Sequence, residues 1–61
     1  MAKFYVIHKG LKYQYSKEDQ YLRVIDKFGV VQKVHPVTCE KEAKLLLQLE
    51  YGIDVESWTM E

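Results

Sequence analysis

The first 35 residues have the hydrophobic patterning of strands. Short segments rich in β-branched and aromatic residues alternate with polar turns, which predicts four strands. Their expected ranges are residues 3–8, 11–16, 21–25 and 30–35. Residues 3–8 and 11–16 either pair as a hairpin around Lys9 and Gly10, or form one long strand bent at Gly10. Pro36 ends the fourth strand, since proline cannot donate to a ladder.

The pattern changes period after the fourth strand. Thr38 is the expected N-cap of a helix whose first turn carries Glu40 and Glu42, where the helix dipole favours negative charge. Gly52 is the expected C-terminal stop, which leaves a helix of about three turns. The predicted fold class is therefore α+β, with an antiparallel three- or four-stranded β-meander packed on one C-terminal helix in two layers.

The expected helix has more apolar surface than one sheet can cover, because Leu45 and Leu49 lie on the side opposite Ala43. Either the C-terminal tail, residues 53–61, folds back over these two leucines, or a second molecule covers them. Trp58 is the residue best suited to anchor the tail or a partner. The tail would cover the leucines with its apolar side chains, which are Ile53, Val55, Trp58 and Met60.

Length and composition limit the classes of protein that fit. Residues 1–61 make one domain with a small core, which leaves little room for a substrate pocket of about 300 Å³ or more. The single cysteine, Cys39, excludes an internal disulfide, and no Cys/His cluster has zinc-ligand spacing. The longest apolar run, residues 43–49, is far shorter than the roughly 20 residues of a membrane span, and the N-terminus lacks a signal region. We therefore expect a cytoplasmic protein with no cofactor, no metal and no membrane or small-molecule partner.

The formal net charge of zero is made of two opposite halves. Residues 1–35 hold seven Lys and Arg against three Asp and Glu, a net charge of +4. Residues 36–61 hold two Lys against six Asp and Glu, a net charge of −4. The predicted sheet is therefore basic and the helix with its tail is acidic, an asymmetry that bears on binding partners rather than on fold.

Alternation along the strands places polar and basic side chains on one face of the sheet. One self-consistent assignment puts six of them on the face away from the helix, namely Lys12, Gln14, Tyr21, Arg23, Lys33 and His35. Lys and Arg at such a face contact phosphates, while Gln and Arg contact base edges, and a twisted sheet can enter the major groove. The alternative is an ordinary solvated face, since the sequence pI of 6.7 is below the value above 9 that is typical of DNA-binding domains.

One segment resembles a known DNA-binding hairpin. Residues 21–34 combine an aromatic-led strand, an Ile-Asp-x-Phe-Gly turn and a Gln three residues after the glycine. The following region adds Thr38 as a cap, Glu42 followed by Ala43, a leucine-rich run and the closing Gly52-Ile53-Asp54. Together they are similar to the N-terminal arm-type DNA-binding domain of the tyrosine-recombinase integrases of phages and conjugative transposons. Plant AP2-type domains share the layout of three strands and a helix.

The resemblance covers about residues 11–54. It implies a three-stranded antiparallel sheet backed by one helix, with the outer face of the sheet in the DNA major groove. Two features differ from such domains: the added apolar segment at residues 4–7 requires a further or extended strand, and the chain is less basic.

Candidate catalytic residues are few. His8, His35 and Cys39 supply a Cys–His pair if the fourth strand ends near the helix start. The other interpretation of Cys39 is a small buried side chain on the inner face of the helix. No third group or oxyanion donor accompanies them in the sequence, and no nucleotide-binding or metal motif is present. We therefore expect a protein that is not an enzyme.

Two functional hypotheses follow. The first is a DNA-binding module that binds double-stranded DNA through the outer face of its sheet, with Lys12, Gln14, Arg23 and Lys33 making most contacts and Lys3, Tyr21 and His35 beside them. The second is a small phage or mobile-element protein that binds another protein, as an inhibitor, adaptor or homodimer. In that case the acidic helix is the contact surface, through Leu45, Leu49 and Trp58.

Overall fold

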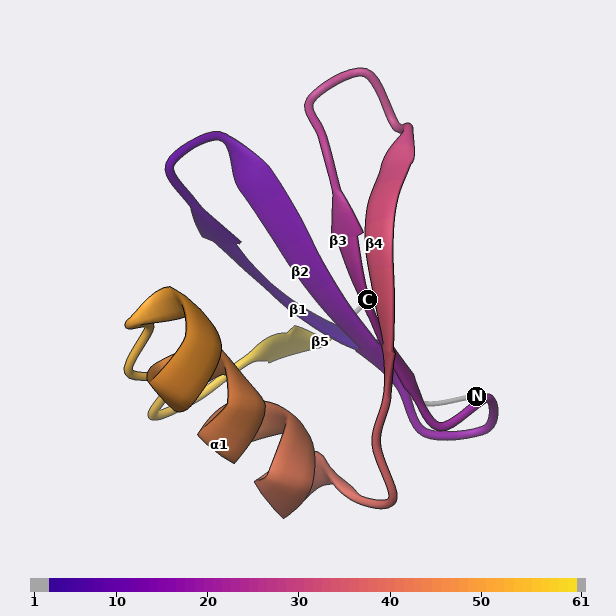
Figure 1. The fold of residues 1–61 in the computed structure, drawn as a ribbon, viewed down its shortest axis with the longest axis vertical. Coiled ribbons are helices and arrows are strands. Elements are labelled where there is room, and N and C mark those ends of the chain that lie inside the picture. The colour runs from indigo at the N-terminus through magenta and orange to yellow at the C-terminus, as the bar shows by residue number, and fades with distance from the viewer. Residues whose placement is uncertain (1–2, 61) are drawn as a thin grey trace.

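The computed structural model describes residues 3–60 and has two layers, a five-stranded antiparallel sheet and one helix (Figure 1). The sheet has the order β4-β3-β2-β1-β5. The elements are β1 (Lys3–His8), β2 (Leu11–Ser16), β3 (Tyr21–Ile25), β4 (Val31–Pro36), α1 (Glu40–Tyr51) and β5 (Thr59–Met60). The predicted α+β meander with one C-terminal helix is confirmed, and β4 begins and ends one residue later than expected.

The turn after β1 decides between the two interpretations of the N-terminal region. Lys9 and Gly10 both have positive φ, at 53° and 79°, which is the conformation of a two-residue type I′ turn. His8 and Leu11 pair directly across this turn. Residues 3–8 are therefore a separate strand, which pairs with β2 in a hairpin.

The loop between β3 and β4 is organised by the Asp26 carboxylate. Its Oδ1 accepts hydrogen bonds from the N–H groups of Phe28 and Val30, both at 2.9 Å, and its Oδ2 accepts one from Gln32 Nε2 at 2.7 Å. Gly29, with φ 83°, donates its N–H to the Asp26 carbonyl. The result is a fixed loop that presents the Phe28 ring at its tip, 80% exposed.

The sequence indicated Thr38 as the N-cap of α1, but the N-cap is Cys39. Cys39 has an extended backbone and makes no side-chain capping bond. Thr38 acts from one residue further out, since its hydroxyl donates to Glu42 Oε2 at 2.9 Å and its N–H donates to Oε1. Glu42 thus holds the incoming chain much as the third residue of a capping box does. Gly52 ends the helix in the left-handed conformation, φ 68°, as predicted.

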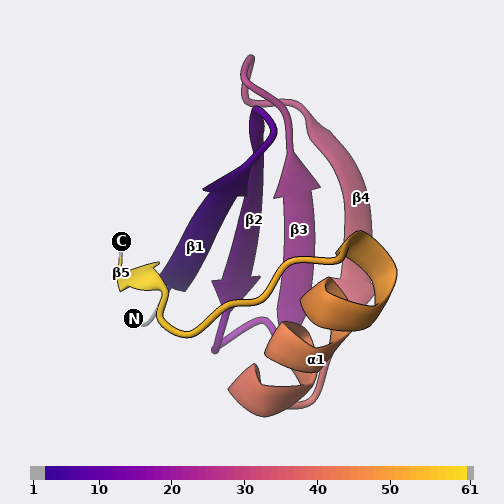
Figure 2. The ribbon, with the colours of Figure 1, turned by 90° about the vertical axis from the view of Figure 1, so that its left-hand side faces the viewer.

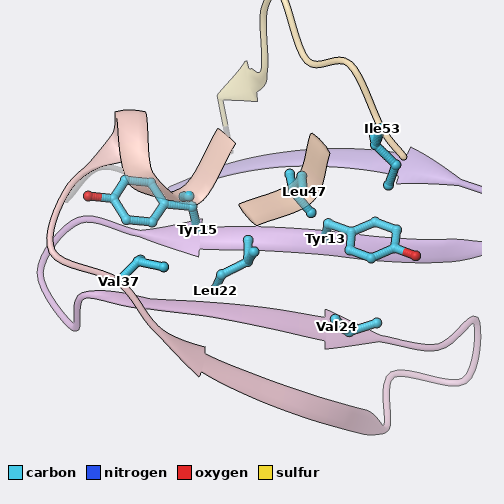
Figure 3. Close-up of a cluster of buried hydrophobic side chains, with 8 residues drawn as sticks. Tyr13, Tyr15, Leu22, Val24, Val37, Leu47 and Ile53 are labelled. Carbon is cyan, nitrogen blue, oxygen red and sulfur yellow. The ribbon is translucent and has the colours of Figure 1, made fainter. Parts of the chain in front are cut away.

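The core lies between the inner face of the sheet and the inner side of α1 (Figure 3). Its buried members are Tyr13, Tyr15, Leu22, Val24, Val37, Ala43, Leu47 and Ile53. Leu22 and Leu47, from opposite layers, have no exposed surface. The Tyr13 ring lies 5.0 Å from that of Tyr51, which seals one end of the core with an aromatic pair.

The C-terminal tail is part of the fold. After the helix it crosses the sheet to β5, which pairs with β1 through Phe4 and Tyr5 (Figure 2). On the way Ile53 is buried, and Trp58 stacks on Tyr15 with ring centroids 6.1 Å apart. The tail therefore covers the β1 and β2 side of the inner sheet face, and Glu61, the last residue of the predicted tail, lies outside the described residues.

The expectation that the tail covers Leu45 and Leu49 is wrong. Leu45 remains 52% exposed and Leu49 75% exposed. The reason is geometric: α1 already covers β3 and β4, so the tail runs beside the helix to reach the vacant inner face of β1 and β2 (Figure 2). Through Trp58 the tail packs against the rings of Phe4 and Tyr15 and not against the solvent side of the helix.

Candidate interaction surfaces

The face of the sheet away from α1, called the outer face below, is defined by strand register. One row across the strands is Tyr5, Gln14, Arg23 and Val34, and the next is Ile7, Lys12, Ile25 and Val31. A third row is Lys3, Ser16, Tyr21 and Pro36. Direct cross-strand partners share a face, so the predicted outward placement of Lys12, Gln14, Tyr21 and Arg23 is confirmed.

The predicted outward placement of Lys33 and His35 is wrong. Lys33 pairs with Val24 and His35 pairs with Leu22, and both of these partners point into the core. Placing Val30 and Val34 on the buried side gave the opposite phase, and a shift of one residue turns every side chain to the other face. At an edge strand this phase is tolerated, because Lys33 stays exposed and His35 finds a partner in Tyr51.

His35 and Tyr51 form a part-buried polar contact between the sheet and the helix. His35 Nε2 lies 2.7 Å from the Tyr51 hydroxyl, and the rings meet edge to face. Burial raises the pKa of the Tyr51 hydroxyl above its ordinary value of 10.0, with smaller contributions from Tyr13 and Glu50. His35 is therefore a structural residue in this fold rather than a member of a binding face.

The basic groups of the outer face are held by neighbours. Arg23 makes an ion pair with Asp19 at 3.3 Å and lies over the Tyr21 ring at 5.7 Å. Lys12 lies over the Tyr5 ring, 4.7 Å from its centroid. Cation–π contacts of this kind keep the cation at the surface while covering part of the ring. The outer face is thus a mixed surface and not a continuous basic strip.

Apolar side chains form the other part of the outer face. Ile7 is 64% exposed and Val34 46% exposed, and Val31 and Tyr21 are similarly open. Of these, Tyr21 was predicted on the outer face. Ile7 was missed because the sequence alone did not show how residues 3–8 pair with their neighbours, and Val34 was missed because β4 was expected in the opposite phase. The cross-strand pairing of Ile7 with Lys12 places Ile7 on the outer face, because direct partners point to the same side of the sheet.

The solvent side of α1, called the helix face below, is built around Leu45 and Leu49, one helical turn apart. Beside Leu45 lies a shallow groove of about 210 Å³ between the helix and the tail. Val55 forms the opposite apolar side, and Lys41 and Asp54 are among its lining residues. This volume is below the roughly 300–1,000 Å³ of small-molecule pockets, so the groove suits part of a protein surface better than a metabolite.

Trp58 does not join the helix face. Its ring lies 6.4 Å from Phe4 and 6.1 Å from Tyr15, within the core. Lys44, which is paired with Glu40 at 3.2 Å, lies 6.0 Å from the Trp58 ring. Trp58 therefore anchors the tail, and the partner-facing set reduces to the two leucines.

The two sheet edges are protected against strand addition. β4 carries a register shift opposite Val24 and Ile25, an exposed Lys33 and a terminal Pro36, each a feature that discourages edge pairing. The β1 edge is paired with β5 at Phe4 and Tyr5. Contacts with other molecules are therefore better served by the faces than by the edges.

The catalytic candidates do not form a built site. Cys39 is exposed at the helix start rather than buried on its inner face, and the Nε2 atom of His35 faces Tyr51. Within residues 3–60, no three His, Cys, Asp or Glu side chains gather to hold a metal ion. No helix in this part of the chain is long and apolar enough to cross a membrane.

Comparison with protein-family models, with curated proteins and with solved structures finds no match to this chain. The two candidate surfaces are therefore argued from their exposed side chains and charges alone.

Proposed function

We propose that this protein is a protein-binding module that contacts its partner through the helix face. The observation that supports the proposal is the exposure of Leu45 and Leu49 in a fold whose own tail lies beside Leu45 and covers neither of them. Fully burying a leucine side chain contributes about 1.5–3 kcal/mol, and Leu45 and Leu49 are 52% and 75% exposed. Their exposed parts together leave roughly 2–4 kcal/mol of burial unused, which is a large share of the net stability of so small a domain. A partner that covers them recovers it.

The surroundings of the leucines favour a protein as the partner. The groove beside Leu45 combines an apolar side, Val55, with charged rims at Lys41 and Asp54. A hydrophobic centre with a polar rim is the usual layout of protein interfaces. The matching residue pair at one-turn spacing gives the partner a short apolar ridge to enclose.

The test is site-specific photocrosslinking in cells that express the protein. A photoreactive residue is placed at position 49, and for control at Lys17, which is exposed in the β2–β3 turn. We expect a light-dependent protein adduct from position 49, weaker when Leu45→Gln is introduced in the same chain, and none from position 17. Equal adducts from both positions, or none from either, would contradict the proposal.

DNA binding by the outer face is the second candidate function. The observation in its favour is that none of the strands β1 to β4 contains an Asp or Glu, while Lys3, Lys12 and Arg23 share the outer face. Phosphate contacts of this kind give salt-dependent affinity for any duplex. The mixed character of the face and the Asp19 partner of Arg23 make this the weaker candidate.

Mobility-shift titration at low salt tests the DNA hypothesis with a control inside the chain. The double variant Lys12→Ala and Arg23→Ala should weaken duplex binding and flatten its salt dependence. Lys33→Ala, which removes one cation from the inner side of the sheet, should change binding much less. Unmeasurable salt-dependent binding by the wild-type protein rejects this function.

A further inference from the structure

The helix face and the outer face are complementary surfaces of the same molecule. The outer face presents Ile7 and Val34 among basic side chains. The helix face presents Leu45 and Leu49 in the acidic half of the chain. We infer that the helix face of one copy docks on the outer face of a second copy, an inference that rests on the proposed function and names its partner.

Charge supports a second copy as the occupant. Residues 1–35, which contain β1 to β3 and most of β4, have a net charge of +4, and residues 36–61, which contain the helix and the tail, have −4. On the acidic side the exposed carboxylates are Glu42, Glu50, Asp54 and Glu56, which outnumber the exposed Lys41, while Lys44 is paired with Glu40. On the basic side the cations of the outer face are Lys3, Lys12 and Arg23. Opposite potentials favour this contact and disfavour sheet-on-sheet or helix-on-helix pairing, where like charges meet.

The position of the two surfaces fixes the symmetry of the contact. α1 covers the inner side of the sheet (Figure 2), so the helix face and the outer face look in opposite directions. A contact between them is heterologous, head to tail, and leaves one free surface of each kind on every dimer. Association therefore continues beyond the dimer, into a ring or a chain of copies.

Size predicts how strong the contact is. The protein measures 26 × 24 × 19 Å, and its sheet face spans the longest and the shortest axes (Figure 2). The whole sheet face is roughly 500 Å², so even a contact that covered all of it would total only about 1,000 Å² over both copies, the lower limit for a specific interface. The association is accordingly weak, concentration dependent and sensitive to salt.

Two half-blocked variants test the inference, because each keeps one of the two surfaces. The first carries Ile7→Thr and Val34→Thr on the outer face, and the second carries Leu45→Gln and Leu49→Gln on the helix face. These neutral changes alter exposed side chains and introduce no charge that would make the variants attract each other. Phe28→Gln, at the exposed tip of the β3–β4 loop, is the matched control for loss of an exposed apolar side chain.

Sedimentation velocity on purified protein, up to about 1 mM, is the measurement. We expect the wild type and Phe28→Gln to exceed the dimer mass with rising concentration, and added salt to reverse this. Each half-blocked variant alone should associate at least about tenfold more weakly. Their equimolar mixture should form a dimer and stop there, because only one intact pair of surfaces remains.

Three results would overturn the inference: a monomeric wild type throughout, a half-blocked variant that associates as well as the wild type, or a mixture no larger than its parts. Circular dichroism and the thermal midpoint check that each variant is folded. If a double variant is unfolded, a single change on the same surface replaces it, Leu49→Gln on the helix face or Ile7→Thr on the outer face. A monomeric wild type that still gives an adduct with a different protein from position 49 rejects the second copy and leaves the proposed function standing. Absence of both self-association and adducts rejects both.

Discussion

The hydroxyl of Tyr51 lies 2.7 Å from Nε2 of His35, and this contact joins the last turn of α1 to the edge strand β4. It accounts for a histidine on the helix side of an edge strand, because it gives the imidazole a polar partner there. The imidazole of His35 and the hydroxyl of Tyr51 are hydrogen-bond partners in a part-buried place, while the neighbouring Val34 is exposed on the other face. The phase of β4 follows from its register with β3, and the hydrogen bond to Tyr51 gives His35 a polar partner in that phase.

Tyr51→Phe should lower the free energy of unfolding by about 1 kcal/mol, because a part-buried hydrogen bond is lost and the ring remains. Tyr21→Phe is the matched control, since Tyr21 is on the exposed outer face. Urea unfolding followed by circular dichroism gives both values. A loss in Tyr21→Phe as large as that in Tyr51→Phe would show that the His35 contact does not stabilise the fold.

Trp58→Ala should lower the free energy of unfolding by about 3 kcal/mol, since large-to-small changes of packed aromatic residues cost this much. The loss approaches the total stability of a domain of this size. Met60→Ala in the same tail, at an exposed position, should change stability little. Thermal unfolding of both variants is the measurement, and similar midpoints for the two would mean that the tail is not anchored by Trp58.

Stability should fall at alkaline pH. Burial raises the pKa of the Tyr13, Tyr15 and Tyr51 hydroxyls above 10.0 in the folded protein, so the unfolded chain releases these protons first. The contribution to stability is complete below the unfolded pKa and is lost as pH rises through the folded pKa. Urea midpoints from about pH 8 to about pH 11 should decline, and a constant midpoint over this range contradicts the burial of these hydroxyls.

Asp26 should make the protein sensitive to acid. The Val30 backbone hydrogen bond lowers the pKa of the Asp26 carboxyl below 3.8; desolvation opposes the shift, and the Gln32 and Phe28 bonds reinforce it. Stability from this group is present above the unfolded pKa and is lost as pH falls through the folded pKa. Asp26→Asn, which cannot titrate, should show a weaker decline of the thermal midpoint in acid. Parallel declines in both proteins would mean that other groups cause the acid sensitivity.

Local patterns were sufficient for the elements of this fold. β1 to β3 begin and end where β-branched and aromatic runs indicated, and the helix ends at Gly52, where a left-handed residue is needed. The cap of the helix differed by one residue because the Thr38 side chain bonds to Glu42 from outside the helix. Such differences are small because backbone propensity and turn chemistry act over a few residues.

The candidate surfaces were less predictable. Lys12, Gln14, Tyr21 and Arg23 were placed correctly because β2 and β3 are central strands with a clear buried side. Lys33 and His35 were misplaced because β4 is an edge strand, where burial constrains the phase weakly.

The sequence by itself determined a small two-layer α+β domain, a basic sheet and an acidic helix, because periodicity and charge are written residue by residue. Only the tertiary structure decided where the tail runs, and hence that Leu45 and Leu49 stay exposed while Trp58 is packed. It also decided which valines of β4 face water. In both cases side chains far apart in the sequence compete for space on the same inner face of the sheet, and the pattern of a short segment does not show which of them is buried there.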